Sequence, residues 1–168
     1  SDPLHVLVLM GGPDAERAVS IQSGLAITKA LETHPAFEVH SKIIALVDIE
    51  TLRQIPGDVI FPALHGPWGE GGGLQELLQE LGRPYVGSGP PAARMAMEKM
   101  VSKKAALAGG FATPAAVRVG SEQKCPLDPP LVIKPVNEGS SIDVTICHDN
   151  HAVDDALSKV QDQSGDYM

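Results

Sequence analysis

The first 88 residues alternate between short apolar runs and longer segments with helical spacing. The run HVLVLMGG (5–12) is continuously apolar and ends in two glycines, as expected of a strand that is buried on both faces of a parallel sheet. The next segment, residues 13–32, has an acidic start and predicts a helix. Its core-facing positions are expected to be Ala18, Ile21, Leu25, Thr28 and Leu31.

Further strand and helix signals follow in the same order. Strands are predicted within residues 37–47 and 57–66, and a short one within 83–89. Between the last two lies a helical face made by Leu74, Leu77, Leu78 and Leu81. This alternation predicts an α/β fold with a mostly parallel, doubly wound, Rossmann-like sheet, whose ligands bind at the carboxyl ends of the strands. The loops at residues 11–16 and 65–73 lie at such ends.

The pattern changes near residue 90. One long helix is predicted over residues 92–110, followed by three strands within 113–119, 130–136 and 142–148, and then by a helix from about residue 150 to 160. Consecutive strands without intervening helices predict a small antiparallel α+β lobe. We therefore divide the chain into residues 1–90 and residues 91–168.

Composition narrows the class of partner. The chain has 13 basic and 21 acidic residues and a formal charge of −8, which disfavours a nucleic-acid groove. No apolar run is long enough to span a bilayer, and the N-terminus lacks a signal-peptide pattern, so we expect a cytoplasmic protein without membrane association. The two cysteines, Cys125 and Cys147, lie far apart in sequence and suggest neither a disulfide framework nor a zinc site.

Common nucleotide and hydrolase signatures are absent from the sequence. There is no GxxxxGK[ST] motif, the Gly11-Gly12 turn does not extend to GxGxxG, and Gly87-Ser88-Gly89 lacks the spacing of a GxSxG elbow. His148 and His151 have no third ligand nearby in sequence, and we assign no metal ligand in this chain.

The stretch VIKPVNEGSS (132–141) combines a strand, a lysine and a small polar loop. An ammonium such as that of Lys134 is costly inside an apolar strand unless it is paired. The loop that follows offers backbone amides and the hydroxyls of Ser140 and Ser141, which can close over phosphates. The alternative is an ordinary hairpin turn, for which Glu-Gly-Ser-Ser is also suitable.

Four stretches together carry a family resemblance, at residues 11–24, 65–90, 97–114 and 132–144. In order and approximate spacing they resemble D-alanine:D-alanine ligase, a member of the ATP-grasp superfamily. The resemblance covers essentially all 168 residues but only about the first half of the family's chain. It implies that residues 1–90 are a pre-ATP-grasp substrate domain and that residues 91–168 are the small lobe of an ATP-grasp domain whose C-terminal lobe is missing.

The resemblance also assigns roles to six side chains. Glu16, in the first turn of the predicted helix, would anchor the ammonium of the first D-alanine, and His65 would lie beside that substrate. Lys99 and Lys134 would bind the phosphates of ATP together with Ser140 and Ser141, and Ser140 would also join the hydrogen-bond network around the glutamate. Without the resemblance, a carboxylate at a helix start, a histidine at a strand end and a solvated helix lysine are the plainer interpretations.

The implied activity is ATP-dependent ligation of two D-alanines through an acyl phosphate, for peptidoglycan synthesis. Magnesium is expected, with ligands in the missing lobe, and homodimers are usual in the family. We expect the 168-residue chain to be inactive alone. Gly71 and Asp143 stand where relatives usually have aspartate and glycine. They keep open a noncatalytic binding module, beside a ligase that takes D-lactate or D-serine as its second substrate.

Overall fold

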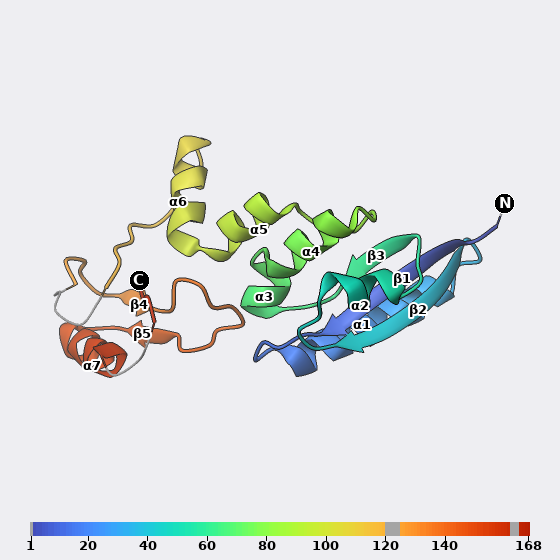
Figure 1. The fold of residues 1–168 in the computed structure, drawn as a ribbon. Coiled ribbons are helices and arrows are strands. Elements are labelled where there is room, and N and C mark those ends of the chain that lie inside the picture. Colours follow the sequence, from blue (N-terminus) through green and yellow to red (C-terminus); the bar gives the residue numbers. More distant parts are fainter. Residues whose placement is uncertain (1, 120–124, 162–164) are drawn as a thin grey trace. The chain divides into compact units, whose positions relative to one another are not determined.

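The computed structural model describes residues 2–119, 125–161 and 165–168, and no residue assigned to a site above lies in the gaps. The chain divides into two compact units, residues 1–94 and 95–168. Figure 1 shows strands and helices in both of them. The roles that the resemblance assigns to the two domains stay predictions.

The first unit is built on a parallel sheet. Its strands are β1 (Leu4–Gly11), β2 (Phe37–Ile44) and β3 (Val59–Pro62), in the order β2-β1-β3. Both pairings are parallel, with Leu4 opposite Phe37 and Val6 opposite Val59. The α/β class with a parallel sheet is thus confirmed. The strand predicted within residues 83–89 is reduced to a single parallel bridge between Ile60 and Tyr85.

Helices connect and follow the strands of this sheet, and the first, second and fourth of them contribute to the cores on its two faces. They are α1 (Arg17–Glu32), α2 (Ile49–Gln54), α3 (Gly66–Glu70), α4 (Gly73–Leu81) and α5 (Pro90–Met97). Alternate residues of β1 point to opposite faces, so Leu7 and Leu9 join a core with residues of α2 and α4, whereas Val8 and Met10 join a core with residues of α1. The continuous apolar run of β1 therefore reflects burial on both sides.

The buried face of α1 agrees with the predicted one at Thr28 and partly at Ile21 and Leu31, but differs at Ala18 and Leu25. Leu25 is 54% exposed, and the buried positions are Ser20, Gly24 and Thr28. The reason is close packing, because a Cβ placed on Gly24 would lie 2.6 Å from the Cβ of Met10. Small residues thus let α1 approach β1, and the larger apolar side chains lie at the edges of the contact.

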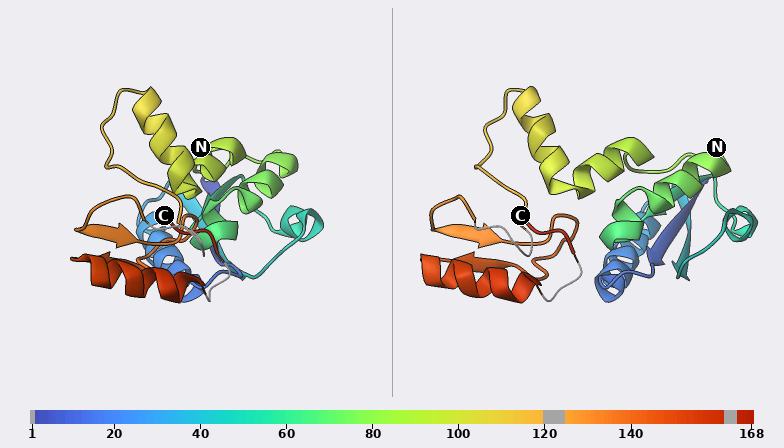
Figure 2. Two further views of the ribbon diagram at one scale, coloured as in Figure 1. Left: turned by 90° about the vertical axis from the view of Figure 1, so that its left-hand side faces the viewer. Right: turned by 60° about the vertical axis from the view of Figure 1, so that its left-hand side comes forward.

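The second unit has a small two-stranded sheet. Strands β4 (Leu131–Ile133) and β5 (Thr145–Cys147) pair antiparallel, and α7 (Asn150–Gln161) lies along them in both views of Figure 2. Val153 and Ala156 of α7 join Ile133 and Cys147 in the core. The antiparallel pairing predicted for this half is confirmed, but residues 113–119 form no strand beyond a bridge between Val119 and Tyr167.

The long helix predicted over residues 92–110 is two helices. Residue Glu98 leaves the helical conformation, with φ −86° and ψ 104°, and separates α5 from α6 (Lys99–Ala108). Its carboxylate accepts hydrogen bonds from the backbone N–H groups of Met100 and Val101. Glu98 therefore caps α6, which places Lys99 at the first helical position.

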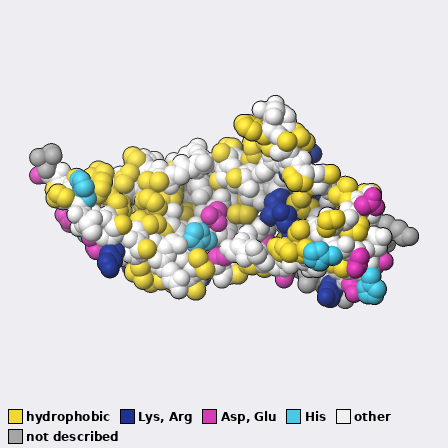
Figure 3. All heavy atoms as spheres, turned by 180° about the vertical axis from the view of Figure 1, so that it is seen from behind, with side chains coloured by type: hydrophobic (Ala, Val, Ile, Leu, Met, Phe, Trp, Pro, Cys, Tyr) yellow, Lys and Arg dark blue, Asp and Glu magenta, His cyan; other side chains and the backbone are white. Residues whose placement is uncertain are grey.

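The surface of the described residues is mixed in character. Figure 3 shows hydrophobic side chains interspersed with charged ones, and the lysines and arginines on that face lie in separate groups. Within the described ranges, none of the helices has the length and apolar content that a bilayer crossing requires. Cys125 and Cys147 are free thiols, one half-buried and one buried, and burial raises the pKa of Cys147.

Candidate active site

In the first unit, the carboxyl ends of β1 and β3 are joined by a buried serine. The Ser20 hydroxyl accepts a hydrogen bond from Gly11 N at 2.8 Å and donates one to Ala63 O at 2.7 Å. Arg17 Nη1 donates to Gly12 O at 2.7 Å and also bonds Ile44 O at the end of β2. The backbone around the two strand ends is therefore held by side chains of α1.

Glu16 lies at this edge of the sheet. It occupies the N-cap position of α1 rather than its first turn, because the helix begins at Arg17. The residue is only 6% exposed, and its Oε2 has no hydrogen-bond partner among the described residues. A buried carboxylate oxygen without a partner is costly, so this atom is poised to accept from a cationic or hydroxyl group.

The His65 loop approaches Glu16 through its glycine. Gly66 has φ +93°, and a Cβ on it would lie 2.7 Å from Glu16 Oε2. His65 itself is half-buried, with Nε2 3.1 Å from Ser23 Oγ and Nδ1 3.5 Å from Glu70 Oε1. The first unit thus brings the carboxylate of Glu16 and the segment that carries His65 to the same place.

Part of the predicted loop over residues 65–73 is the short helix α3. Asp14 Oδ2 accepts hydrogen bonds from Trp68 N at 2.9 Å and from Gly69 N at 3.1 Å, which satisfies free amides in the first turn of that helix. Asp14 was read from the sequence as part of the acidic start of α1, whereas it stabilises α3. The polar partners Asp14, Ser20 and Ser23 were all missed as site residues, because their roles depend on contacts far away in sequence.

In the second unit, two lysines lie close together. Lys99 Nζ donates to Val136 O at 3.1 Å and to Glu138 O. Burial lowers the pKa of Lys99, and the charge of Lys134 lowers it further, so the two ammonium groups act on each other. Lys134 follows directly after β4 and is half-buried. The plain interpretation of Lys99 as a solvated helix charge is therefore wrong.

The serine loop has an unusual backbone. Ser140, Ser141 and Asp143 have φ angles of 53°, 59° and 51°, a region that favours glycine. Asp143 thus keeps the conformation that the glycine of relatives would adopt easily, and aspartate is among the residues that tolerate it best. All three residues are exposed. Ile142 N donates to Gly139 O at 3.0 Å, so Ser140 and Ser141 are the central residues of a turn, and positive φ at both is also a feature of type I′ hairpin turns.

A cavity of about 580 Å³ lies in the same unit. Its lining includes apolar residues such as Val117 and Ile133, together with the cations Lys103 and Lys134. This size is typical of small-molecule pockets. Sequence reasoning missed the cavity because its wall contains residues 114–117 and Val119, which were predicted as part of a strand.

Comparisons with known proteins agree with the fold and the motifs. A family model described as the D-ala D-ala ligase N-terminus matches residues 45–88. The D-alanine–D-alanine ligase of Methylacidiphilum infernorum is 38% identical over 160 residues, covering 94% of this chain and 51% of that protein. The same-named protein of Ruegeria pomeroyi is 45% identical over 144 residues, covering 84% of this chain and 47% of that protein.

A solved structure supports the same conclusion. The D-alanine–D-alanine ligase of Bacillus anthracis complexed with ATP has a TM-score of 0.80 and 29% identity, covering 99% of this chain and 56% of that one. In sequence and fold, the chain matches the N-terminal half of D-alanine–D-alanine ligases. It spans about half the length of the curated relatives that it matches.

Proposed function

We propose that this chain is the substrate-binding and phosphate-binding half of an ATP-dependent enzyme that joins two D-alanines. The observation that carries the proposal is the buried Glu16 carboxylate, whose Oε2 has no partner among the described residues and faces the backbone of Gly66. A small amino acid has an ammonium group that fits this need. D-alanine is the substrate that the family relationship favours.

Glu16 is assigned the ammonium of the first D-alanine. Because Gly66 has no side chain, its backbone lies close beside the Glu16 carboxylate. This close approach favours a ligand as small as alanine. His65, which is oriented by Ser23 and Glu70, is assigned a place beside the same substrate. Ser140 is proposed to reach this carboxylate when the enzyme closes, as the resemblance implies.

The second unit is assigned to ATP. Lys99 and Lys134 provide two neighbouring positive charges, and the lowered pKa of Lys99 is the expected consequence of placing two cations together in a partly buried site. A polyphosphate would relieve that repulsion. The amides and hydroxyls of Ser140 and Ser141 are assigned to the phosphates, and the cavity lined by Val117 and Ile133 is assigned to the base.

The proposed chemistry follows from these two sites. The carboxylate of the first D-alanine attacks the γ-phosphorus of ATP, and the bond from that phosphorus to the bridging oxygen breaks, giving an acyl phosphate and ADP. The amine of the second D-alanine then attacks the acyl carbon and loses a proton, while inorganic phosphate leaves with the electrons of the broken carbon–oxygen bond. The protein contributes by positioning and by neutralising charge.

Magnesium would neutralise part of the negative charge of the ATP phosphates, so that the D-alanine carboxylate could approach them with less repulsion. We assign no magnesium ligand among the described residues of this chain, and the expectation stays that the ligands come from the C-terminal half of the family's chain. Homodimer formation and a role in peptidoglycan synthesis in the cytoplasm are likewise part of the proposal.

Phosphate release tests this function. The assay uses ATP, magnesium and D-alanine, with the product of the uninterrupted reading frame, its Lys134→Ala variant and the 168-residue chain as separate samples. We expect release that requires D-alanine, that falls by at least about 100-fold in the variant, and that is absent from the 168-residue chain. Dipeptide analysis of the products identifies D-alanyl-D-alanine.

Other results would assign a different function. Release that requires a second substrate such as D-lactate or D-serine would identify a ligase of different specificity. A folded product that binds ATP but releases no phosphate with any of these substrates would refute the ligase and support a noncatalytic binding module. D-alanyl-D-alanine made by the 168-residue chain would overturn the expectation that this half is inactive alone.

A further inference from the structure

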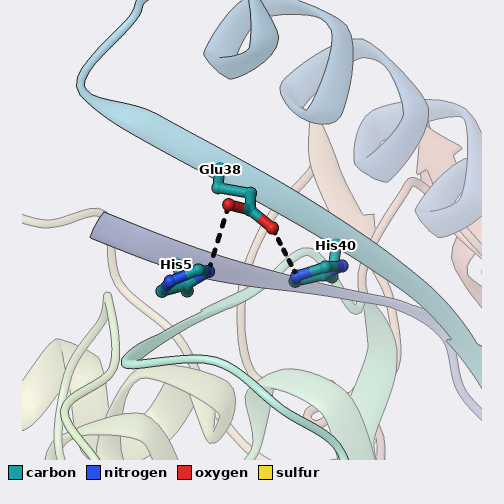
Figure 4. A group of neighbouring side chains, drawn as sticks. All are labelled: His5, Glu38 and His40. Carbon is teal, nitrogen blue, oxygen red and sulfur yellow. Dashed lines mark ion pairs between the residues drawn. The ribbon is translucent and has the colours of Figure 1, made fainter. Parts of the chain in front are cut away.

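Two histidines and a glutamate meet at the amino ends of the parallel strands. His5 lies on β1, and Glu38 and His40 lie on β2 (Figure 4). The register pairs His5 with Glu38 and Leu7 with His40. Since residues two apart on a strand share a face, all three side chains project from the same side of the sheet. The group lies at the end of the strands opposite to Glu16 and His65 and takes no part in the proposed ligase site.

The three side chains converge on one point. Glu38 Oε2 is 3.7 Å from His5 Nδ1, and Glu38 Oε1 is 3.6 Å from His40 Nε2. Figure 4 shows both rings directed at the carboxylate from the same side. The rings are nearly parallel, with an angle of 8° between their planes. One ligand atom from each residue lies within 4.8 Å of the other two, the only such trio found in the described residues.

The backbone beneath the group is fixed. His5 N donates to Asp58 Oδ2 at 3.0 Å, and Asp58 N donates to His5 O at 2.8 Å. This reciprocal pair ties the start of β1 to the residue before β3. The β2 residues are held in register with β1 over eight consecutive pairs. Only side-chain torsions are therefore left to adjust, which keeps the entropic cost of binding a ligand low.

We propose that His5, Glu38 and His40 form a binding site for a zinc-class divalent cation. Two imidazoles and one carboxylate, with water in the fourth position, are an established tetrahedral ligand set for zinc. Metal–ligand bonds of about 2.0–2.2 Å place neighbouring ligand atoms of a tetrahedron about 3.3–3.5 Å apart. The two nitrogen–oxygen separations exceed that range by only a few tenths of an ångström but involve different oxygens of Glu38. Its exposed carboxylate must therefore rotate to present one oxygen to the metal.

The competing interpretation is a surface cluster of ion pairs that binds nothing. Exposed ion pairs contribute little to stability, so an ion-pair cluster of these three side chains would stabilise the fold only slightly. Both interpretations account for the two rings that direct a nitrogen at the Glu38 carboxylate, and metal binding distinguishes them. Softer or more strongly binding ions such as Cu²⁺ would compete with zinc at these ligands.

Direct metal binding tests the proposal. The 168-residue protein is prepared without an affinity tag, stripped with a chelator, and titrated with zinc against a chromophoric competitor. A Cys125→Ser background is used, because an accessible thiolate also binds zinc. We expect one zinc per chain. His40→Gln, His5→Gln and Glu38→Gln should each weaken binding by at least about 100-fold, more than the loss typical of an outer-shell partner.

The control is His148→Gln, which removes an exposed imidazole from the second unit. It should leave zinc binding unchanged. Cobalt absorption bands of a tetrahedral site should appear in the parent and vanish in His40→Gln. Circular dichroism of the metal-free variants checks that each is folded. Stoichiometric binding that survives all three substitutions, or no binding below millimolar zinc by the folded parent, would overturn the proposal. Neither result bears on the ligase function, because the readout is independent of turnover.

Discussion

The two units differ in how their candidate sites are built. In the first unit, Glu16 is buried, His65 is hydrogen-bonded to Ser23, and the ends of β1 and β3 beside them are joined through Ser20. In the second unit, Ser140 and Ser141 lie on an exposed segment, and α6 has no buried residue. The first candidate site is therefore built from buried and hydrogen-bonded groups, whereas the serine segment of the second is exposed and suited to closing over a ligand.

The largest effect is expected at the tightest point of the first site. Gly66→Ala should lower the free energy of unfolding by about 3–4 kcal/mol, because its φ is +93° and the new Cβ would lie 2.4 Å from Asp14 Cβ. Gly82→Ala is the matched control, since Gly82 also has positive φ but has no atom within 4 Å of that position. It should cost about 1 kcal/mol. Equal losses in denaturant unfolding would show that steric crowding is unimportant at Gly66.

A smaller loss is expected from Ser20→Ala. It leaves Gly11 N and Ala63 O without their buried partner, and we expect a destabilisation of about 1–3 kcal/mol. Ser158→Ala in the second unit serves as the comparison, because Ser158 makes a single exposed bond within α7. That change should stay within about 0.5 kcal/mol. If the two variants unfolded alike, the strand ends would not be held as described.

The loop of the second unit should respond in the opposite direction. Asp143→Gly relieves a positive φ of 51°, so we expect a gain of up to about 1 kcal/mol in the free energy of unfolding. It also removes a carboxylate near the proposed phosphate site and should tighten ATP binding. Asp128→Gly, at an exposed position without positive φ, should destabilise slightly. A loss of stability in Asp143→Gly would mean that the aspartate contributes contacts that outweigh its strain.

The smallest effect concerns titration. Lys134→Ala removes the nearby like charge, so the pKa of Lys99 should rise but stay below its usual value, because burial is the larger cause of its shift. Carbon NMR of the lysine side chains measures this. Because the pKa of Lys99 is lowered in the folded state, the protein takes up a proton when it unfolds at a pH between the folded-state pKa and the ordinary lysine pKa. Through that window the free energy of unfolding therefore rises with pH. An unchanged pKa in the variant would show that the two ammonium groups do not interact.

Sequence patterns predicted the first unit better than the second. The apolar run of β1 and the leucines of α4 have a single simple explanation in burial, and both elements form where expected. The break at Glu98 could not be predicted, because residues 92–110 are compatible with a continuous helix and the break depends on a cap. The helix α3 was missed because its glycines and proline resemble a loop, and Asp14 supplies its missing partners from a distant segment.

The sequence also identified site residues more readily than it predicted how they are arranged. Glu16 and Lys134 were found through motifs, but the burial of Glu16, the positive φ of Ser140 and the proximity of Lys99 to Lys134 depend on tertiary structure. The metal site proposed at His5, Glu38 and His40 has no sequence signature, because its ligands come from two strands more than 30 positions apart. Only the pairing of β1 with β2 brings them together.

We propose that the first unit binds the amino acid and that the second unit binds the nucleotide. Steady-state kinetics of the product of the uninterrupted reading frame test it most directly, with ATP and D-alanine varied separately in Glu16→Gln and Lys134→Ala. We expect Glu16→Gln to raise the KM for D-alanine at least about tenfold while the KM for ATP changes less than about twofold. Lys134→Ala should show the reverse. Equal changes in both constants in either variant would contradict this division of labour.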